Sequence, residues 1–224
     1  MSHLGGMTDF RTRSVTSHKR PLRAGISYFC HAAHRQAAEM LIWLNGPFGA
    51  GKTTLAEALR ARQPDILIFD PEEIGYLVKT LVTLPNSGDF QDLPLWRTMT
   101  VAALRAVREH YPQDIVVPMT LVRPQYLDEI LGSLARDGER VLHVFLSPDE
   151  AILRARIAAQ IMSDDPTRDE DIRQWRLAQV DRCLAAKEWM PEQTHFMDSG
   201  AMQPGVLAEQ IMERAREMKA ARPA

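Results

Sequence analysis

Hydrophobic and polar residues alternate along this chain in blocks of two lengths. Short apolar runs are followed by longer stretches in which apolar residues recur at helical spacing. The runs are too apolar for a sheet with one solvated face, and they indicate strands covered on both faces. The predicted strands are 40–45, 65–69, 114–119, 141–146 and 195–197, and the predicted helices are 52–62, 94–110, 124–137, 149–162, 171–187 and 204–219. This alternation predicts an α/β fold, doubly wound around a mainly parallel five-stranded sheet.

Two stretches interrupt the alternation. Residues 83–94 are loop-like and lead into the helix that carries Trp96, and residues 163–171 are polar and charged between two predicted helices. Segments of this kind often cover a binding site. We therefore expect one domain over 40–220, with a cap at about 83–110 and a lid at about 160–176.

The boundaries and faces of two helices carry further signals. Before the helix at 149–162, Ser147 is the expected N-cap and Pro148 the expected first helical residue. The last helix, 204–219, has apolar residues along one side, and we expect that side to dock on the sheet. The alternative is a membrane-surface role, which is disfavoured because the polar face of this helix is mixed in charge rather than basic.

The first 39 residues differ in composition from the rest of the chain. Within positions 7–25 they carry five basic residues against one acidic residue, Asp9, and they lack apolar periodicity. This composition resembles an organellar transit peptide. The simpler interpretation, which we favour, is a disordered tail or a start codon assigned upstream of the true one. Met40, directly before the first strand, is the candidate alternative start.

Composition and charge exclude several classes of function. The chain has 224 residues and a formal net charge of −2, so it lacks the basic field of a nucleic-acid-binding protein. No apolar run reaches the roughly 18 residues of a membrane-spanning helix, which leaves peripheral membrane contact open. Cys30 and Cys183 form no CxxC motif. Their spacing argues against a disulfide framework or a zinc site and favours the cytoplasm.

The stretch "GPFGAGKTT" at 46–54 contains the pattern G-x-x-x-x-G-K-[ST] between a predicted strand and a predicted helix, the context that a phosphate-binding loop requires. Glycines let the backbone turn successive N–H groups toward phosphate oxygens, and the helix N-terminus adds partial positive charge. Lys52 would reach the β- and γ-phosphates, and the Thr53 hydroxyl would ligate Mg²⁺. The alternative, a glycine-rich turn with an incidental lysine, does not explain this context. We therefore predict that ATP and Mg²⁺ are bound by Gly46, Pro47, Phe48, Gly49, Ala50, Gly51, Lys52, Thr53 and Thr54.

A candidate catalytic carboxylate follows the second predicted strand. Asp70 stands at its carboxyl end, where parallel α/β sheets bind their ligands. It could hold Mg²⁺ or accept a proton from a substrate hydroxyl. The alternative is that Asp70 caps a helix opened by Pro71 and Glu72. Glu72 and Glu73 are interpreted as first-turn partners of the helix dipole.

The third strand and the arginines narrow the class of enzyme. Thr120 stands where many NTP-hydrolysing proteins place an acidic Mg²⁺ ligand, which argues against a powerful ATPase. Arg123 just beyond it could contact phosphate or substrate, or form a surface ion pair. Near the lid, a guanidinium could neutralise charge that develops in phosphoryl transfer; otherwise these arginines belong to a solvated helix face. The lid candidates are Arg154, Arg156, Arg168, Arg173 and Arg176.

Taken together, these motifs resemble the tunicamycin-resistance proteins, a branch of small P-loop kinase-like ATP-binding proteins. The resemblance covers about residues 40–215. It rests on "WLNGPFGAGKT" (43–53), "DPEEIG" (70–75), "DFQDLPLWR" (89–97), "VPMTLVRPQYLDEI" (117–130) and "QVDRC" (179–183). It implies ATP binding, an adenylate-kinase-like fold, and protection from a nucleoside antibiotic by modification or by binding.

The resemblance also implies roles for residues outside the phosphate loop. Asp70 would face the acceptor, and the cap opposite it would be formed by Asp89, Phe90, Trp96 and Arg97. Such a cap suits a uracil- and sugar-bearing ligand, although Trp96 could equally serve as core packing. Arg123, Arg154 and Arg156 also fall at matching positions.

Two functions remain open. The first is an ATP-dependent phosphotransferase acting on a hydroxyl of a nucleoside-like or antibiotic small molecule, with Lys52, Asp70, Arg154 and Arg156 as catalytic residues and Thr53 and Asp70 at the metal. The second is a non-catalytic protein that sequesters the antibiotic when ATP is bound. A nucleotide switch ranks last, because the guanine-specifying N-K-x-D is absent from the sequence.

Overall fold

The computed structural model describes residues 39–221. The prediction of an N-terminal tail over 1–39 therefore lies, except for its last residue, outside the described residues. Among the helices of the described part, none is long and apolar enough to cross a membrane.

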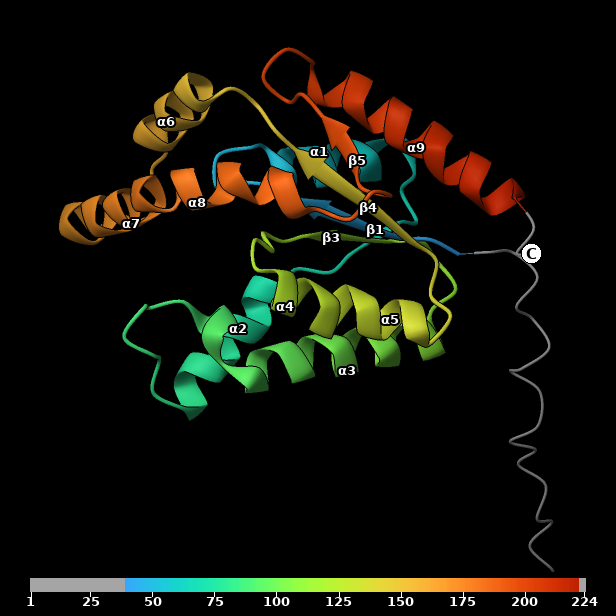
Figure 1. Ribbon diagram of the computed structural model, residues 1–224, viewed down its shortest axis with the longest axis horizontal. Helices are drawn as coiled ribbons and strands as arrows, with labels where there is room; N and C mark the ends of the chain where they lie inside the picture. Colours follow the sequence, from blue (N-terminus) through green and yellow to red (C-terminus); the bar gives the residue numbers. More distant parts are fainter. Residues whose placement is uncertain (1–38, 222–224) are drawn as a thin grey trace, which may run out of the picture. The chain divides into compact units, whose positions relative to one another are not determined.

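A single five-stranded sheet forms the centre of the described part (Figure 1). Its strand order is β2-β3-β1-β4-β5, and every neighbouring pair is parallel. In the central strand, Leu41 aligns with Ile115 of β3 on one side and with Val141 of β4 on the other. The predicted parallel α/β sheet is thus confirmed, with strands β1 Leu41–Asn45, β2 Leu67–Ile68, β3 Ile115–Pro118, β4 Val141–Leu146 and β5 His195–Met197.

Helices cover both faces of this sheet (Figure 1). One face carries α1 (Lys52–Arg62) and α9 (Pro204–Ala220), and the other carries α3 (Pro94–His110) and the helical segment 124–136. That segment consists of α4 Pro124–Leu127, the π-turn η2 Asp128–Gly132 and α5 Ser133–Arg136. The remaining elements are α2 Pro71–Leu81, η1 Phe90–Asp92, α6 Glu150–Ala159, α7 Pro166–Ala178, α8 Val180–Ala185 and η3 Ala186–Trp189.

The last helix docks on the core, as its apolar side predicts. Leu207, Ala208, Ile211 and Ala215 of α9 are buried in the same cluster as Ile42 of the central strand. Full burial of a leucine or isoleucine side chain contributes about 1.5–3 kcal/mol relative to an exposed position. The apolar side of α9 is therefore part of the hydrophobic core.

Two predicted helix starts are wrong. Helix α6 begins at Glu150 with Asp149 as its N-cap, so Ser147 and Pro148 precede it. Helix α7 begins at Pro166, five residues before the predicted 171, because the Asp165 carboxylate accepts hydrogen bonds from two N–H groups of the first turn. Asp followed by Pro is a strong local start signal. The charged stretch 163–171 is therefore largely helical.

Candidate functional site

The predicted phosphate loop lies between β1 and α1, at the edge where the parallel strands end. Gly46 has φ 129°, and a Cβ there would lie 2.5 Å from the Leu146 carbonyl oxygen, so only glycine fits. Gly51 has φ 92° and is the N-cap residue of α1, where, as a glycine, it has no side chain to cap the helix. Among residues 39–221, no side chain caps the first N–H groups of α1, and such groups can bind an anion.

The side chain of Lys52 is folded back over the loop. Its Nζ donates hydrogen bonds to the carbonyl oxygens of Gly46 (3.0 Å) and Pro47 (2.8 Å). Burial lowers the pKa of Lys52 to about 8. Thr53 and Thr54, the second and third residues of α1, are exposed. The lysine ammonium and the Thr53 hydroxyl thus stand at the same end of α1, where a nucleotide phosphate would be held.

A buried amide, absent from the sequence-based set of site residues, anchors the loop from behind. The Asn45 Oδ1 accepts hydrogen bonds from the N–H groups of Gly46 (2.7 Å) and Leu121 (2.8 Å), and its Nδ2 donates to the Leu121 carbonyl (2.8 Å). Thr120, which stands where many NTP-hydrolysing proteins place an acidic Mg²⁺ ligand, is buried and donates its hydroxyl proton to the Gly46 carbonyl at 2.8 Å. These two residues fix the first glycine of the loop to the end of β3.

Asp70 lies at the carboxyl end of β2 and caps α2. Its Oδ1 accepts a hydrogen bond from the Glu72 N–H at 2.9 Å, as the helix-cap alternative predicts. Glu72 is more than a partner of the helix dipole: burial, and then the neighbouring Asp70 charge, raise the pKa of its carboxyl group. Lys52 and Arg176 oppose this rise in the Glu72 pKa. Two carboxylates and two cations therefore share this part of the sheet edge.

Of the arginines named from the sequence near the lid, Arg176 is the one whose guanidinium lies over the phosphate loop. Its Cζ is 5.5 Å from the centroid of the Phe48 ring, and Lys52 Nζ is 5.7 Å from the same centroid. Burial lowers the pKa of Arg176. Arg154 instead pairs at the surface with Glu150 (2.7 Å) and Asp181 (2.6 Å).

Arg156 lies at the other end of the loop. Its Nη2 donates to the Ser199 carbonyl at 2.9 Å, and the Ser199 hydroxyl donates to the Ala50 carbonyl at 2.7 Å. The segment after β5 is thus tied to the phosphate loop, an arrangement that no local motif around Ser199 predicts. Arg173 pairs with Asp169 within α7.

The predicted cap residues divide into buried and accessible ones. Trp96 is fully buried, donating its indole N–H to the Pro71 carbonyl (3.0 Å) and packing against Phe90. Arg97 is also buried, bonded to the Gln91 carbonyl (2.6 Å) and paired with Glu129. Both side chains hold the cap together and offer almost no surface to a ligand.

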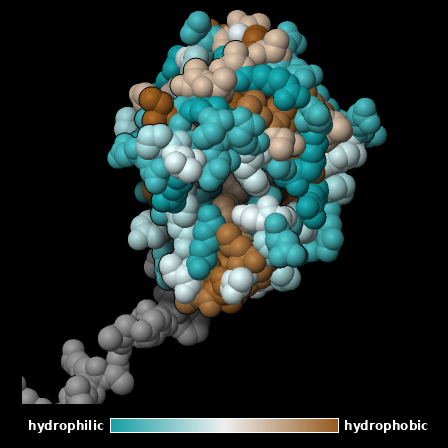
Figure 2. All heavy atoms as spheres, turned by 90° about the vertical axis from the view of Figure 1, so that its left-hand side faces the viewer, coloured by the Kyte–Doolittle hydropathy of each residue, from teal (hydrophilic) through white to brown (hydrophobic). Residues whose placement is uncertain are grey.

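The other cap residues are closer to solvent or to the lid. Phe90 is half-buried, whereas the Arg123 side chain is 44% exposed and pairs with Asp92 at 3.3 Å, as the ion-pair alternative predicts. Asp89 is buried with its Oδ2 3.6 Å from Arg182 of α8, and burial raises the pKa of its carboxyl group. Figure 2, which faces the strand ends, shows a hollow between the α6–α8 side and the α2 side.

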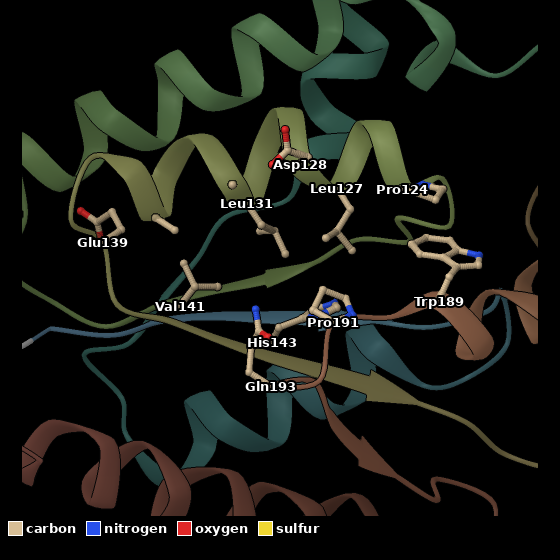
Figure 3. A pocket seen from close by; sticks show the side chains of 12 residues that line it. Pro124, Leu127, Asp128, Leu131, Glu139, Val141, His143, Trp189, Pro191 and Gln193 are labelled. Carbon is tan, nitrogen blue, oxygen red and sulfur yellow. The ribbon is translucent and has the colours of Figure 1, made fainter.

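A separate cavity of 490 Å³ lies between the helical segment 124–136 and the chain that leads into β5 (Figure 3). Leu127, Leu131 and Trp189 line it, but none of the site residues predicted above does. His143, also in its lining, is buried between Asn45 (3.1 Å) and Thr194 (3.0 Å), and burial lowers its pKa to about 4. The imidazole is therefore neutral and accepts a hydrogen bond from Asn45 Nδ2.

The all-parallel sheet order and the glycine loop between β1 and α1 define a P-loop α/β protein of the kinase-like type. Residues 41–185 match a family model described as an AAA domain, and the chain belongs to this family. No curated protein matches the chain significantly.

Solved structures with this fold include small-molecule kinases. The tunicamycin resistance protein of Deinococcus radiodurans is 24% identical, with a TM-score of 0.61 over 80% of this chain and 95% of that one. A sugar kinase from Janibacter is 16% identical (TM-score 0.56, 84% and 99%), and a gluconokinase from Sinorhizobium meliloti is 17% identical (TM-score 0.50, 83% and 94%). The resemblance to tunicamycin-resistance proteins is thus confirmed in the fold.

Proposed function

We propose that this protein is an ATP- and Mg²⁺-dependent phosphotransferase that acts on a hydroxyl group of a small molecule, either nucleoside-like or an antibiotic. The observation that carries the proposal is the meeting of Lys52, Asp70 and Arg176 at one end of the sheet, around a loop that only glycines can form. Phosphoryl transfer needs such a set, because its catalysis consists mainly of positioning and of neutralising charge. The kinases among the proteins of like fold support this reaction class.

The phosphate loop would hold the nucleotide, with backbone N–H groups and Lys52 on the phosphate oxygens. Mg²⁺ would be held by the hydroxyl oxygen of Thr53, a ligand type this ion prefers, while Asp70, the other metal candidate, is left free to take the acceptor proton. Within residues 39–221 no cluster of three or more His, Cys, Asp or Glu side chains could hold a metal. The protein therefore contributes few ligands, as is usual when substrate phosphates complete the coordination. Bound there, Mg²⁺ would neutralise charge on the phosphates.

Asp70 is the proposed general base. Its cap hydrogen bond occupies Oδ1 and orients the carboxylate, while the hydrogen bonds of the described residues leave Oδ2 unbonded. A carboxylate held in this way can accept the proton of an acceptor hydroxyl as the oxygen attacks phosphorus. Arg176 is the proposed cation over the transferring group, because its guanidinium lies over Phe48 of the phosphate loop. Arg154 instead pairs with Glu150 and Asp181, and Arg156 donates to the Ser199 carbonyl.

The acceptor would lie on the cap side, next to Asp89, Phe90 and Arg123. We propose a cytoplasmic location, where ATP is available and where the cysteine usage fits. We propose a nucleoside-like or antibiotic substrate because the chain shares its fold with a tunicamycin resistance protein. The proposal names this class of molecule and no particular compound.

The test is incubation of the protein with ATP, Mg²⁺ and tunicamycin or a panel of nucleosides, followed by mass spectrometry of the small molecule. We expect a product heavier by one phosphoryl group, and no product from the Lys52→Ala variant. Tunicamycin that binds in an ATP-dependent manner but keeps its mass would favour the sequestering alternative.

A further inference from the structure

Trp175 of α7 contacts two segments that are far apart in the sequence, the phosphate loop and the loop before η1. Its ring centroid is 5.2 Å from that of Phe48 in the phosphate loop, with the ring planes at 66°, an edge-to-face arrangement. Its indole N–H donates to the Ser87 carbonyl at 3.4 Å. One side chain thus touches the nucleotide side and the loop that opens the cap.

A second contact reinforces the link to the cap. Arg182 of α8 lies 3.6 Å from the Asp89 carboxylate, whose side chain is only 8% exposed. The other oxygen of Asp89 accepts the Gln91 N–H at 3.0 Å, and the Gln91 amide donates to the Thr120 carbonyl at 2.9 Å. The segment 87–91 is therefore tied both to α7–α8 and to the end of β3.

The residue next to Trp175 is Arg176, whose guanidinium lies over the ring of Phe48. The Phe48 ring thus makes an edge-to-face contact with Trp175 and a cation–π contact with Arg176, whose Cζ is 5.5 Å from the ring centroid. Arg176 also donates to the Gln160 side chain at 2.9 Å, which fixes it to the end of α6. A shift of Trp175 would move Arg176, because the two are adjacent on one helix.

We propose that Trp175 is a positioning residue that couples the phosphate loop to the cap: its contacts with Phe48 and with the Ser87 carbonyl set α7, and with it Arg176, in place only when both sides are ordered. The role of Arg176 rests on the proposed function. The coupling itself concerns nucleotide binding alone. Nucleotide that orders the phosphate loop should therefore also order residues 84–92, where the acceptor would bind.

Amide hydrogen exchange with and without Mg²⁺·ATP tests the coupling without a turnover assay. In the wild-type protein we expect ATP to slow exchange both at 46–54 and at 84–92. In Trp175→Ala the protection at 46–54 should remain and that at 84–92 should be lost. Tyr111→Ala is the matched control, because it removes a 53% exposed aromatic ring at the end of α3, and it should keep both effects.

The conservative variant Trp175→Phe separates the two contacts. It keeps an aromatic ring against Phe48 but has no N–H to donate to the Ser87 carbonyl, so protection at 84–92 should again be lost. This variant decides the question if Trp175→Ala does not fold. Where turnover is measurable, Trp175→Phe should lower kcat and leave the KM for ATP unchanged, since the phosphate loop is intact.

The outcomes separate the coupling from the proposed function. Equal protection of 84–92 in the wild type and in both Trp175 variants would overturn the coupling. Protection of 46–54 alone in the wild type would do so as well. Absence of protection at 46–54 in the wild type would instead remove the nucleotide site, and the proposed function with it.

Discussion

Replacing Asn45 by alanine should destabilise the protein strongly, although Asn45 touches no ligand in the proposed reaction. Four hydrogen bonds end on its amide, from the N–H groups of Gly46 and Leu121, to the Leu121 carbonyl, and to the His143 ring. Asn45 is 0% exposed, so its partners lie in the interior. Each buried group left without a partner costs about 1–3 kcal/mol. Water that enters the space vacated by the amide would offset part of this.

We therefore expect Asn45→Ala to lower the free energy of unfolding by about 3–5 kcal/mol, a large part of the roughly 5–15 kcal/mol typical of a domain. Urea unfolding at pH 7, followed by circular dichroism, measures the difference. Asn86→Ala is the control, because Asn86 is exposed and forms none of these bonds. A loss below about 1 kcal/mol, the range of ordinary surface substitutions, would refute the view that Asn45 holds the phosphate loop.

Further predictions concern the carboxylate, the lid and the buried histidine. Asp70→Asn should lower turnover ~10²–10⁴-fold with ATP affinity by calorimetry nearly unchanged, because asparagine still caps α2 but cannot take the proton; unchanged turnover would remove the base. Arg176→Ala should lower kcat by at least ~10²-fold, and Arg173→Ala much less, since Arg173 pairs with Asp169 within α7; equal losses would contradict the assignment. Burial lowers the pKa of His143 in the folded protein to about 4. Below the ordinary histidine pKa of 6.5, the unfolded state therefore binds more protons than the folded state. Stability is therefore full above pH 6.5 and falls toward pH 4, by about 2 kcal/mol between pH 7 and pH 5. Urea titrations of the wild type and His143→Gln should show this loss only with the histidine present.

The sequence determined the elements whose signals are local. Apolar runs predicted β4 and β5 with their observed bounds, and helical spacing did the same for α1 and α3. Chain connectivity and buried strands then favoured a parallel sheet, because a helix between two strands returns the chain to the end of the sheet where the first strand began. The phosphate loop was likewise predictable, since its chemistry needs glycines, a lysine and a hydroxyl within a few consecutive residues.

The tertiary structure decided what depends on residues far apart in the chain. Asn45 meets Leu121 across 76 positions, and Ser199 meets Ala50 across 149, so no local pattern marks either residue. Arg176 could not be chosen among the arginines, because only the packing of α7 on Phe48 brings its guanidinium to the loop. Trp96 and Arg97 lie in a motif that suggests ligand contact, yet the fold buries both in the cap. Sequence spacing fixes which residues share a helix face, whereas burial and long-range hydrogen bonds depend on how the faces meet.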